Sequence, residues 1–103
     1  MDKEKIINIA KIFSKKVIEF INADKIILYG SDAKGTQRID SDIDIAIVIK
    51  NGRYNFFKTY SSLSRICRET DTRIEPIIIE KNKDYSGFLD TIKKEGIVVY
   101  SRT

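Results

Sequence analysis

Apolar residues recur at every third or fourth position in three stretches of the chain, and this spacing predicts three amphipathic helices. The first stretch covers residues 6–21, and the second covers about 53–69. The third contains Tyr85 and ends before Gly96, where two lysines followed by a glycine form a typical helix end. We expect each helix to bury its apolar face and to expose the other.

Four apolar runs are too short for helices and predict β-strands. They cover residues 26–29, 42–50, 72–79 and 97–100. The third run contains Pro76, which cannot donate a hydrogen bond to a neighbouring strand and so indicates a sheet edge, a bulge or a strand start. Between the first two runs, residues 31–35 predict one helical turn that begins at Ser31, and residues 36–41 predict a loop.

The order of these elements predicts the fold class. Helix, strand, turn, strand, helix, strand, helix and strand follow one another without a repeat or a linker. We therefore expect an α/β (α+β) fold with a single mixed sheet of about four strands and helices mainly on one face. The chain has 103 residues and is 42% hydrophobic, which suits one domain, residues 1–103, built around one core.

The second strand has two different faces. Asp42 and Asp44 share one face with Ala46 and Val48, while the alternate positions from 43 to 49 are all isoleucine. The isoleucine face is expected to meet the helices, and the acidic face is expected to line an open cleft. The two carboxylates are about 6.5 Å apart along the strand, since each residue rises roughly 3.3 Å. Acids can also simply protect a sheet edge from aggregation, but on such a hydrophobic strand this pair predicts a cation site.

Composition narrows the chemistry. The chain has no histidine and a single cysteine, Cys67, which excludes an imidazole base, an internal disulfide and a typical zinc site. Cys67 is expected to be a buried apolar residue of a protein from a reducing compartment, the cytoplasm. No apolar run is long enough for a membrane span, and the N-terminus does not resemble a signal peptide. The net charge of +4 suits an anionic partner, although the scattered basic residues favour a solvated surface over a nucleic-acid patch.

The acid pair and the Gly-Ser turn before it suggest phosphate chemistry. Two carboxylates roughly 4 Å apart repel each other by about 4 kcal/mol at an effective dielectric of about 20, and a divalent cation removes that cost. Without thiolate or imidazole ligands the metal would be hard, Mg²⁺ or Mn²⁺, and phosphate oxygens would complete its shell. Gly30 permits close backbone approach, and Ser31 at a helix start offers a hydroxyl and free amides to an anion. These features together predict phosphoryl or nucleotidyl transfer with two metal ions.

The same residues resemble a known family. Gly30-Ser31, ten residues, and then Asp42-Ile43-Asp44 are similar to the GS-x10-D-x-D signature of the DNA polymerase β-like nucleotidyltransferases, and above all to the minimal nucleotidyltransferase group. Lys34 stands where the family usually has arginine. The resemblance implies the palm-like fold of that superfamily. It also implies that Asp42 and Asp44 bridge the metals and that Gly30, Ser31 and Lys34 contact the triphosphate.

The family's third acid is usually an aspartate on the next long strand, where this chain has Glu75. In an extended strand Glu75, Ile77 and Ile79 share a face, so we expect Glu75 to lie beside the aspartate pair as a third metal ligand and general base. Asp71 is a weaker alternative for this role.

The resemblance also implies a reaction and a partner. Minimal nucleotidyltransferases transfer a nucleoside monophosphate, most often AMP from ATP, to a hydroxyl, and they commonly pair with a small helical HEPN-family protein. In toxin–antitoxin versions the transferase is the antitoxin and modifies a tyrosine of its toxic RNase partner. We expect this chain to be such an antitoxin, while other acceptors and the oligomeric state stay open.

Two other functions remain in view. The chain may retain nucleotide or partner binding with little catalysis and neutralise its partner by occlusion, since Glu75 replaces the usual aspartate. Alternatively, it is a basic nucleic-acid adaptor that has kept the fold.

Overall fold

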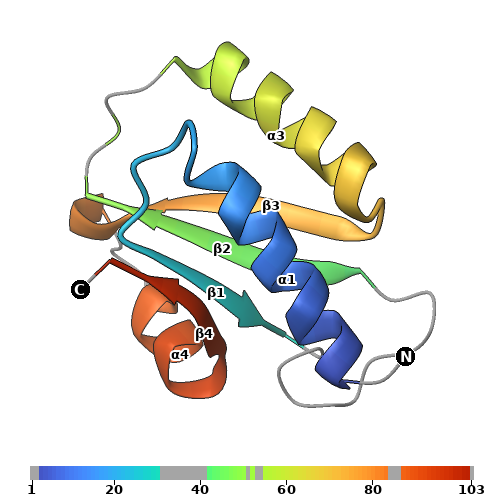
Figure 1. Cartoon of the computed structure of the whole chain (residues 1–103). Coiled ribbons are helices and arrows are strands. Elements are labelled where there is room, and N and C mark those ends of the chain that lie inside the picture. The colour runs from blue at the N-terminus through green and yellow to red at the C-terminus, as the bar shows by residue number, and fades with distance from the viewer. Residues whose placement is uncertain (1–2, 31–41, 51, 53–54, 84–86, 103) are drawn as a thin grey trace.

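The computed structural model describes residues 3–30, 42–50, 52, 55–83 and 87–102 of the chain (Figure 1). Its elements follow one another in the order α1 (Lys3–Val17), β1 (Lys25–Tyr29), β2 (Ile43–Ile49), α3 (Phe56–Thr70), β3 (Ile74–Glu80), the short 3-10 helix η1 (Lys81–Lys83), α4 (Phe88–Glu95) and β4 (Ile97–Ser101). The three predicted helices and four predicted strands are confirmed, although the first helix ends at Val17 rather than at residue 21, and Tyr85, predicted in the third helix, lies outside the described residues. The predicted turn and loop at 31–41 lie outside the described residues.

The strands form one mixed four-stranded sheet in the order β3-β2-β1-β4. Strand β1 is antiparallel to both β2 and β4, whereas β2 and β3 are parallel. A parallel neighbour needs a crossover connection, and α3 provides it. Because β3 is an edge strand, Pro76 can sit within it without leaving a neighbouring strand unpaired. The α+β fold and the edge position indicated by the proline are therefore confirmed.

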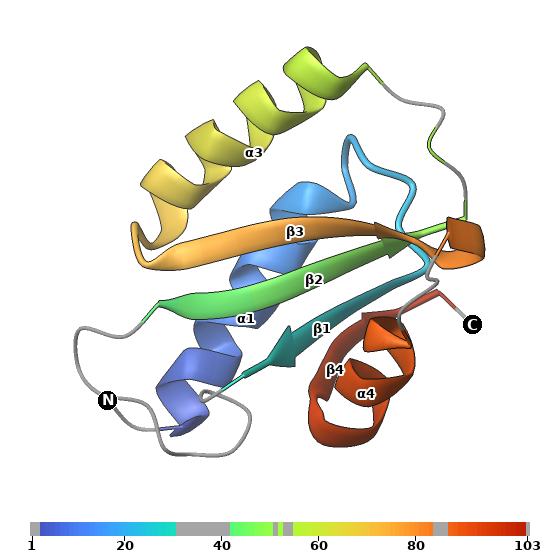
Figure 2. The ribbon, with the colours of Figure 1, turned by 180° about the vertical axis from the view of Figure 1, so that it is seen from behind.

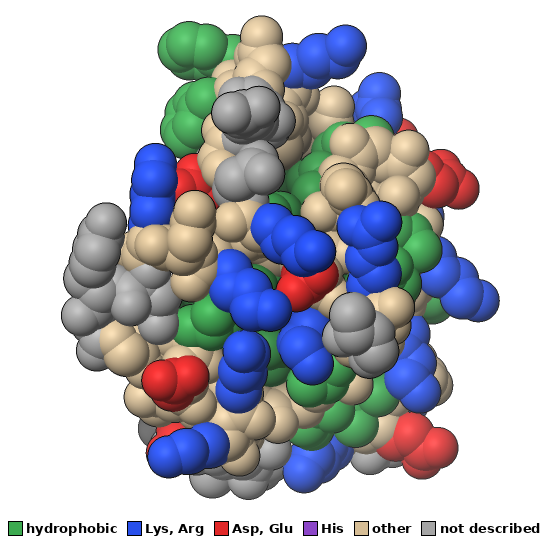
Figure 3. Space-filling view, turned by 90° about the vertical axis from the view of Figure 1, so that its left-hand side faces the viewer, with side chains coloured by type: hydrophobic (Ala, Val, Ile, Leu, Met, Phe, Trp, Pro, Cys, Tyr) green, Lys and Arg blue, Asp and Glu red, His purple; other side chains and the backbone are tan. Residues whose placement is uncertain are grey.

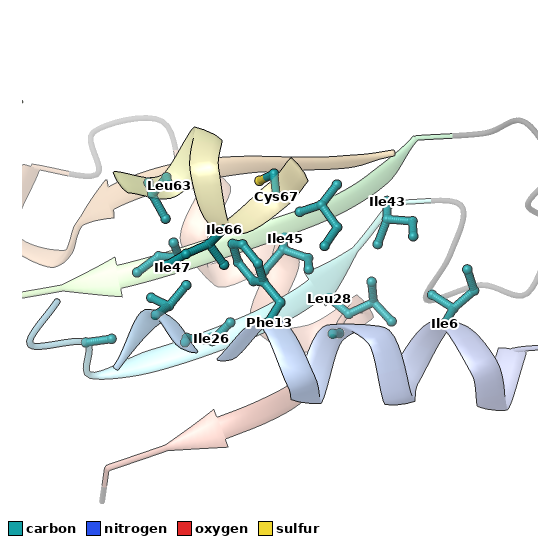
Figure 4. Packing of buried hydrophobic residues seen from close by; sticks show 14 of the residues in the cluster. Ile6, Phe13, Ile26, Leu28, Ile43, Ile45, Ile47, Leu63, Ile66 and Cys67 are labelled. Carbon is teal, nitrogen blue, oxygen red and sulfur yellow. The ribbon is translucent and has the colours of Figure 1, made fainter. Parts of the chain in front are cut away.

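The main core lies between one face of the sheet and helices α1 and α3. The alternate isoleucines of β2 at positions 43, 45 and 47 are fully buried there. Figure 4 shows Phe13 of α1 extending into the space between the sheet and Ile66 of α3. Cys67 lies in the same cluster, as expected for a small apolar residue. Burying each of these large side chains contributes roughly 1.5–3 kcal/mol, so this face provides most of the driving force for folding.

Helix α4 covers part of the other face. Its buried residues Leu89 and Ile92 pack against Ile27, Ala46 and Val48 in a second, smaller core. Figures 1 and 2 show α1 and α4 on opposite sides of the sheet. The expectation that the acidic face of β2 lines an open cleft along its whole length is therefore wrong. The apolar residues on this face of β2, Ala46 and Val48, are buried by the apolar side of α4.

Asp24, directly before β1, forms hydrogen bonds with several neighbouring segments at this end of the sheet. It is only 4% exposed, its backbone N–H donates to the carbonyl of Val48 (2.7 Å), and its own carbonyl accepts from the N–H of Arg102 (2.9 Å). Its carboxylate accepts a hydrogen bond from Lys81 Nζ at 3.1 Å. That bond lowers the pKa of Asp24 against the opposing effect of burial, and the charges of Lys81, Lys50 and Arg102 lower it further. Figure 3 faces this side and shows Lys and Arg side chains gathered around an acidic one.

A search of the described helices for one long and apolar enough to cross a bilayer finds none.

The lowered pKa of Asp24 predicts how stability depends on pH. The folded-state pKa lies below the value of about 3.9 expected in an unfolded chain, so the charged carboxylate stabilises the fold above that pH. This contribution is lost as the pH falls through the folded-state pKa. Urea unfolding between about pH 6 and pH 2.5 should therefore show that Asp24→Asn destabilises the protein near neutrality and progressively less in acid.

The matched control is Glu19→Gln, which changes an exposed acid just after α1. Its difference from the unsubstituted protein should stay small at every pH. A constant difference for Asp24→Asn across the same range would contradict the proposed coupling to Lys81.

Candidate functional site

Three neighbouring strands place three polar side chains in one row across the sheet. Tyr29 of β1 is paired in register with Asp44 of β2, and Asp44 is paired in register with Glu75 of β3. Residues paired in this way lie on the same face of a sheet, with adjacent strands roughly 4.7–4.9 Å apart. We call Tyr29, Asp44 and Glu75 the polar row. The register places Glu75 beside Asp44, as predicted, whereas Asp42 lies outside the paired residues.

The polar row lies at the end of the sheet where β2 and β3 begin. Asp44 is half-buried and Glu75 is exposed. Asp42 is exposed and directly precedes β2, which begins at Ile43 rather than at the aspartate. The N–H of Ile43 donates to the carbonyl of Arg73 at 2.8 Å. The backbone directly after Asp42 is therefore already hydrogen-bonded to the segment that leads into β3.

Position 30 requires a glycine because the backbone there lies against Asp44 of the polar row. Its φ is +75°, a value that favours glycine, and a Cβ built there would lie 2.6 Å from Asp44 Oδ2. A side chain would therefore have to displace the carboxylate. The backbone after β1 approaches Asp44 this closely only because residue 30 is a glycine. The other two expected triphosphate contacts, Ser31 and Lys34, lie outside the described residues.

Tyr29 is the member of the row that the sequence did not reveal. Burial raises the pKa of its phenol, and the negative charges of Asp44 and Glu75 raise it further. The phenol is therefore protonated at neutral pH and can donate a hydrogen bond. Its position directly before Gly30, two residues after Ile27 on the same strand face, was the available signal. This position indicates a functional residue only together with the register, which pairs Tyr29 with Asp44 of β2.

An aromatic contact joins the row to helix α4. The rings of Tyr29 and Phe88 meet edge to face, with centroids 5.7 Å apart and planes at 86°. Such pairs favour this geometry because the ring edge is positive and the face negative. Phe88 is the first residue of α4, and it follows Gly87, whose φ is also +75°.

Asp71, the alternative third acid, has a different role. It ends α3, and its carboxylate pairs with Arg73 through a contact of 2.6 Å to one nitrogen and 3.0 Å to another. These hydrogen bonds lower the pKa of Asp71 against the opposing effect of burial. Asp71 therefore closes the turn between α3 and β3, and the acid in register with Asp44 is Glu75.

The donor chemistry of the row suits a hard metal ion. Carboxylate oxygens are the ligands that Mg²⁺ and Mn²⁺ prefer, and Asp44 and Glu75 offer them on adjacent strands. Within the described ranges, however, no three Asp, Glu, His or Cys side chains stand where they could hold a metal ion together. A metal at this row would need a further carboxylate, or oxygens from a bound phosphate, beside those of Asp44 and Glu75.

Comparison with known proteins identifies the family. The family described as Polymerase beta, Nucleotidyltransferase matches residues 4–103. A relative from Methanocaldococcus jannaschii, named a putative protein adenylyltransferase, is 33% identical over 98 residues, which span 91% of this chain and 98% of that protein.

Solved structures agree on the fold. A crystal structure of a putative nucleotidyltransferase from Sulfolobus solfataricus matches with a TM-score of 0.69 at 24% identity, over 97% of this chain and 84% of the other. A toxin–antitoxin structure with AMP-PNP matches with a TM-score of 0.66 at 18% identity, over 90% of this chain and 74% of the other. The family match and the relative from Methanocaldococcus together show that the chain belongs to the polymerase beta nucleotidyltransferase family and is a nucleotidyltransferase.

Proposed function

We propose that this chain transfers a nucleoside monophosphate, AMP from ATP, to a hydroxyl group of a protein partner. The observation that carries the proposal is the register of the polar row: Asp44 and Glu75 lie side by side, and the backbone of Gly30 lies against the Asp44 carboxylate. Enzymes of this family typically use a nucleoside triphosphate and divalent metal ions.

Each acid has a proposed role. Asp42 and Asp44 would hold the metal ions, two Mg²⁺ or Mn²⁺, with Glu75 as the third ligand. The ions would neutralise the triphosphate and activate the attacking hydroxyl. Gly30, Ser31 and Lys34 would bind the triphosphate, and the glycine leaves the space beside Asp44 free of a side chain.

The reaction moves one adenylyl group from ATP to the acceptor. The acceptor oxygen bonds to the α-phosphorus, the bond from the α-phosphorus to the oxygen bridging it to the β-phosphate breaks, and pyrophosphate leaves. The Glu75 carboxylate takes the proton of the acceptor hydroxyl as general base. Its exposed position on an edge strand suits contact with an acceptor carried by another molecule.

A protein acceptor is supported by two relatives. One is named a putative protein adenylyltransferase, and the other, which shares the fold, was solved as a toxin–antitoxin structure with AMP-PNP. We propose that residues 1–103 form one catalytic domain that acts in the cytoplasm as the antitoxin of a small helical HEPN-family toxin.

One observation favours the alternative function. Three metal-ligating side chains do not converge among the described residues, which favours binding of a nucleotide and a partner without efficient transfer. Neutralisation would then follow from occlusion of the partner.

The main test is label transfer from α-³²P-ATP with Mg²⁺ to the product of the neighbouring open reading frame. Asp44→Asn keeps the shape of the side chain but removes its charge, so we expect the rate of labelling to fall by roughly a hundredfold or more. Glu69→Gln, on the exposed side of α3, is the control and should keep full activity. A partner that binds stably but takes no label from the unsubstituted protein would support occlusion instead.

Gly30→Ala tests the contact with Asp44. The matched control is Gly87→Ala, because Gly87 has the same φ of +75° but nothing within 4 Å of an added Cβ. Both changes should cost about 1 kcal/mol of stability through the backbone. We expect the labelling rate to fall at least about tenfold more for Gly30→Ala, because its Cβ must displace the carboxylate that holds the metal. Equal losses in the two variants would contradict this account.

A further inference from the structure

We propose that Tyr29 and Phe88 form the subsite for the base of the nucleoside triphosphate, with the base stacked on the exposed ring of Phe88. This inference rests on the proposed function and assigns a substrate contact to a helix outside the acidic motif.

The position of the pair follows from the register. Tyr29 is the direct neighbour of Asp44, and the Phe88 ring lies 5.7 Å from the Tyr29 ring. Phe88 is therefore separated from Asp44 by one aromatic ring, that of Tyr29. In a nucleotide, one ribose separates the base from the α-phosphate, which is a comparable spacing. A triphosphate held at Asp44 would bring its base within reach of Phe88.

The exposure of Phe88 also points to a ligand. The apolar stripe of α4 is already buried through Leu89 and Ile92, which are 4% and 3% exposed, whereas Phe88 is 40% exposed. Anchoring the helix therefore does not require an aromatic residue at its first position. Other large apolar side chains of this chain are as exposed, but the ring of Phe88 is in contact with a residue paired with Asp44, and ligand sites are lined mainly by apolar and aromatic side chains.

The pair is held in place before any ligand binds. Tyr29 belongs to a strand in the middle of the sheet, its ring packs against the second core, and its edge-to-face contact fixes the neighbouring ring. A fixed ring loses little conformational freedom when a base stacks on it. Stacking on an aromatic ring is tolerant of base identity, so this surface would take any nucleobase, and it favours purines through their larger area.

The experiment compares two ligands, Mg²⁺-ATP and Mg²⁺-tripolyphosphate, by isothermal titration calorimetry. They share the phosphate chain, but only ATP has a base. Phe88→Leu keeps an apolar side chain to pack against Tyr29 and removes the flat ring. We expect it to weaken ATP binding roughly tenfold and to leave tripolyphosphate binding unchanged. Phe88→Trp, which keeps a flat ring, should bind ATP as the unsubstituted protein does.

Phe57→Ala is the control, because that side chain is 81% exposed on α3, which packs on the opposite face of the sheet. It should bind both ligands as the unsubstituted protein does. Unchanged ATP binding in Phe88→Leu, or an equal loss for both ligands, would overturn the base subsite. Asp44→Asn separates the two proposals: it should weaken both ligands, and if it weakens neither, the proposed function itself falls.

Discussion

The pairing of β2 with two different neighbours is the constraint on which the rest of the structure depends. Strand β2 is antiparallel to β1 on one side and parallel to β3 on the other. Its isoleucine face is sealed by α1 and α3, so the strand cannot slip by one residue without exposing that face to water. The fixed register in turn sets which residues of β1 and β3 lie beside Asp44.

The polar row carries an energetic cost that the core offsets. Asp44 and Glu75 are like charges directly across two strands, an arrangement that destabilises a sheet. On the opposite face, Ile43 and Ile45 of β2 are fully buried and Ile74 of β3 is 4% exposed, so apolar burial anchors both strands regardless of the charges. The half-buried position of Asp44 and the exposed position of Glu75 leave both carboxylates partly in water, which screens their repulsion.

The two ends of the sheet have opposite electrostatic character. The end at which β2 begins carries the acids of the polar row, while at the other end Asp24 is buried among Lys50, Lys81 and Arg102. Between them, α4 covers the apolar part of the acidic face and brings Phe88 to Tyr29. The acidic end of the sheet therefore has an aromatic pair beside it, and α1 and α3 cover the opposite face.

Local patterns in the sequence determined the helices, the strands and the two different faces of β2, because periodicity is a property of neighbouring residues. Alternation also placed Glu75 on the face of Ile77, and the proline indicated an edge. Only the tertiary structure decided that Tyr29 is the neighbour of Asp44, that α4 covers half of the acidic face, and that cations far apart in the chain meet at Asp24. A helix's spacing shows which of its sides is apolar but not which sheet face that side will meet, and strand order depends on packing between segments distant in sequence.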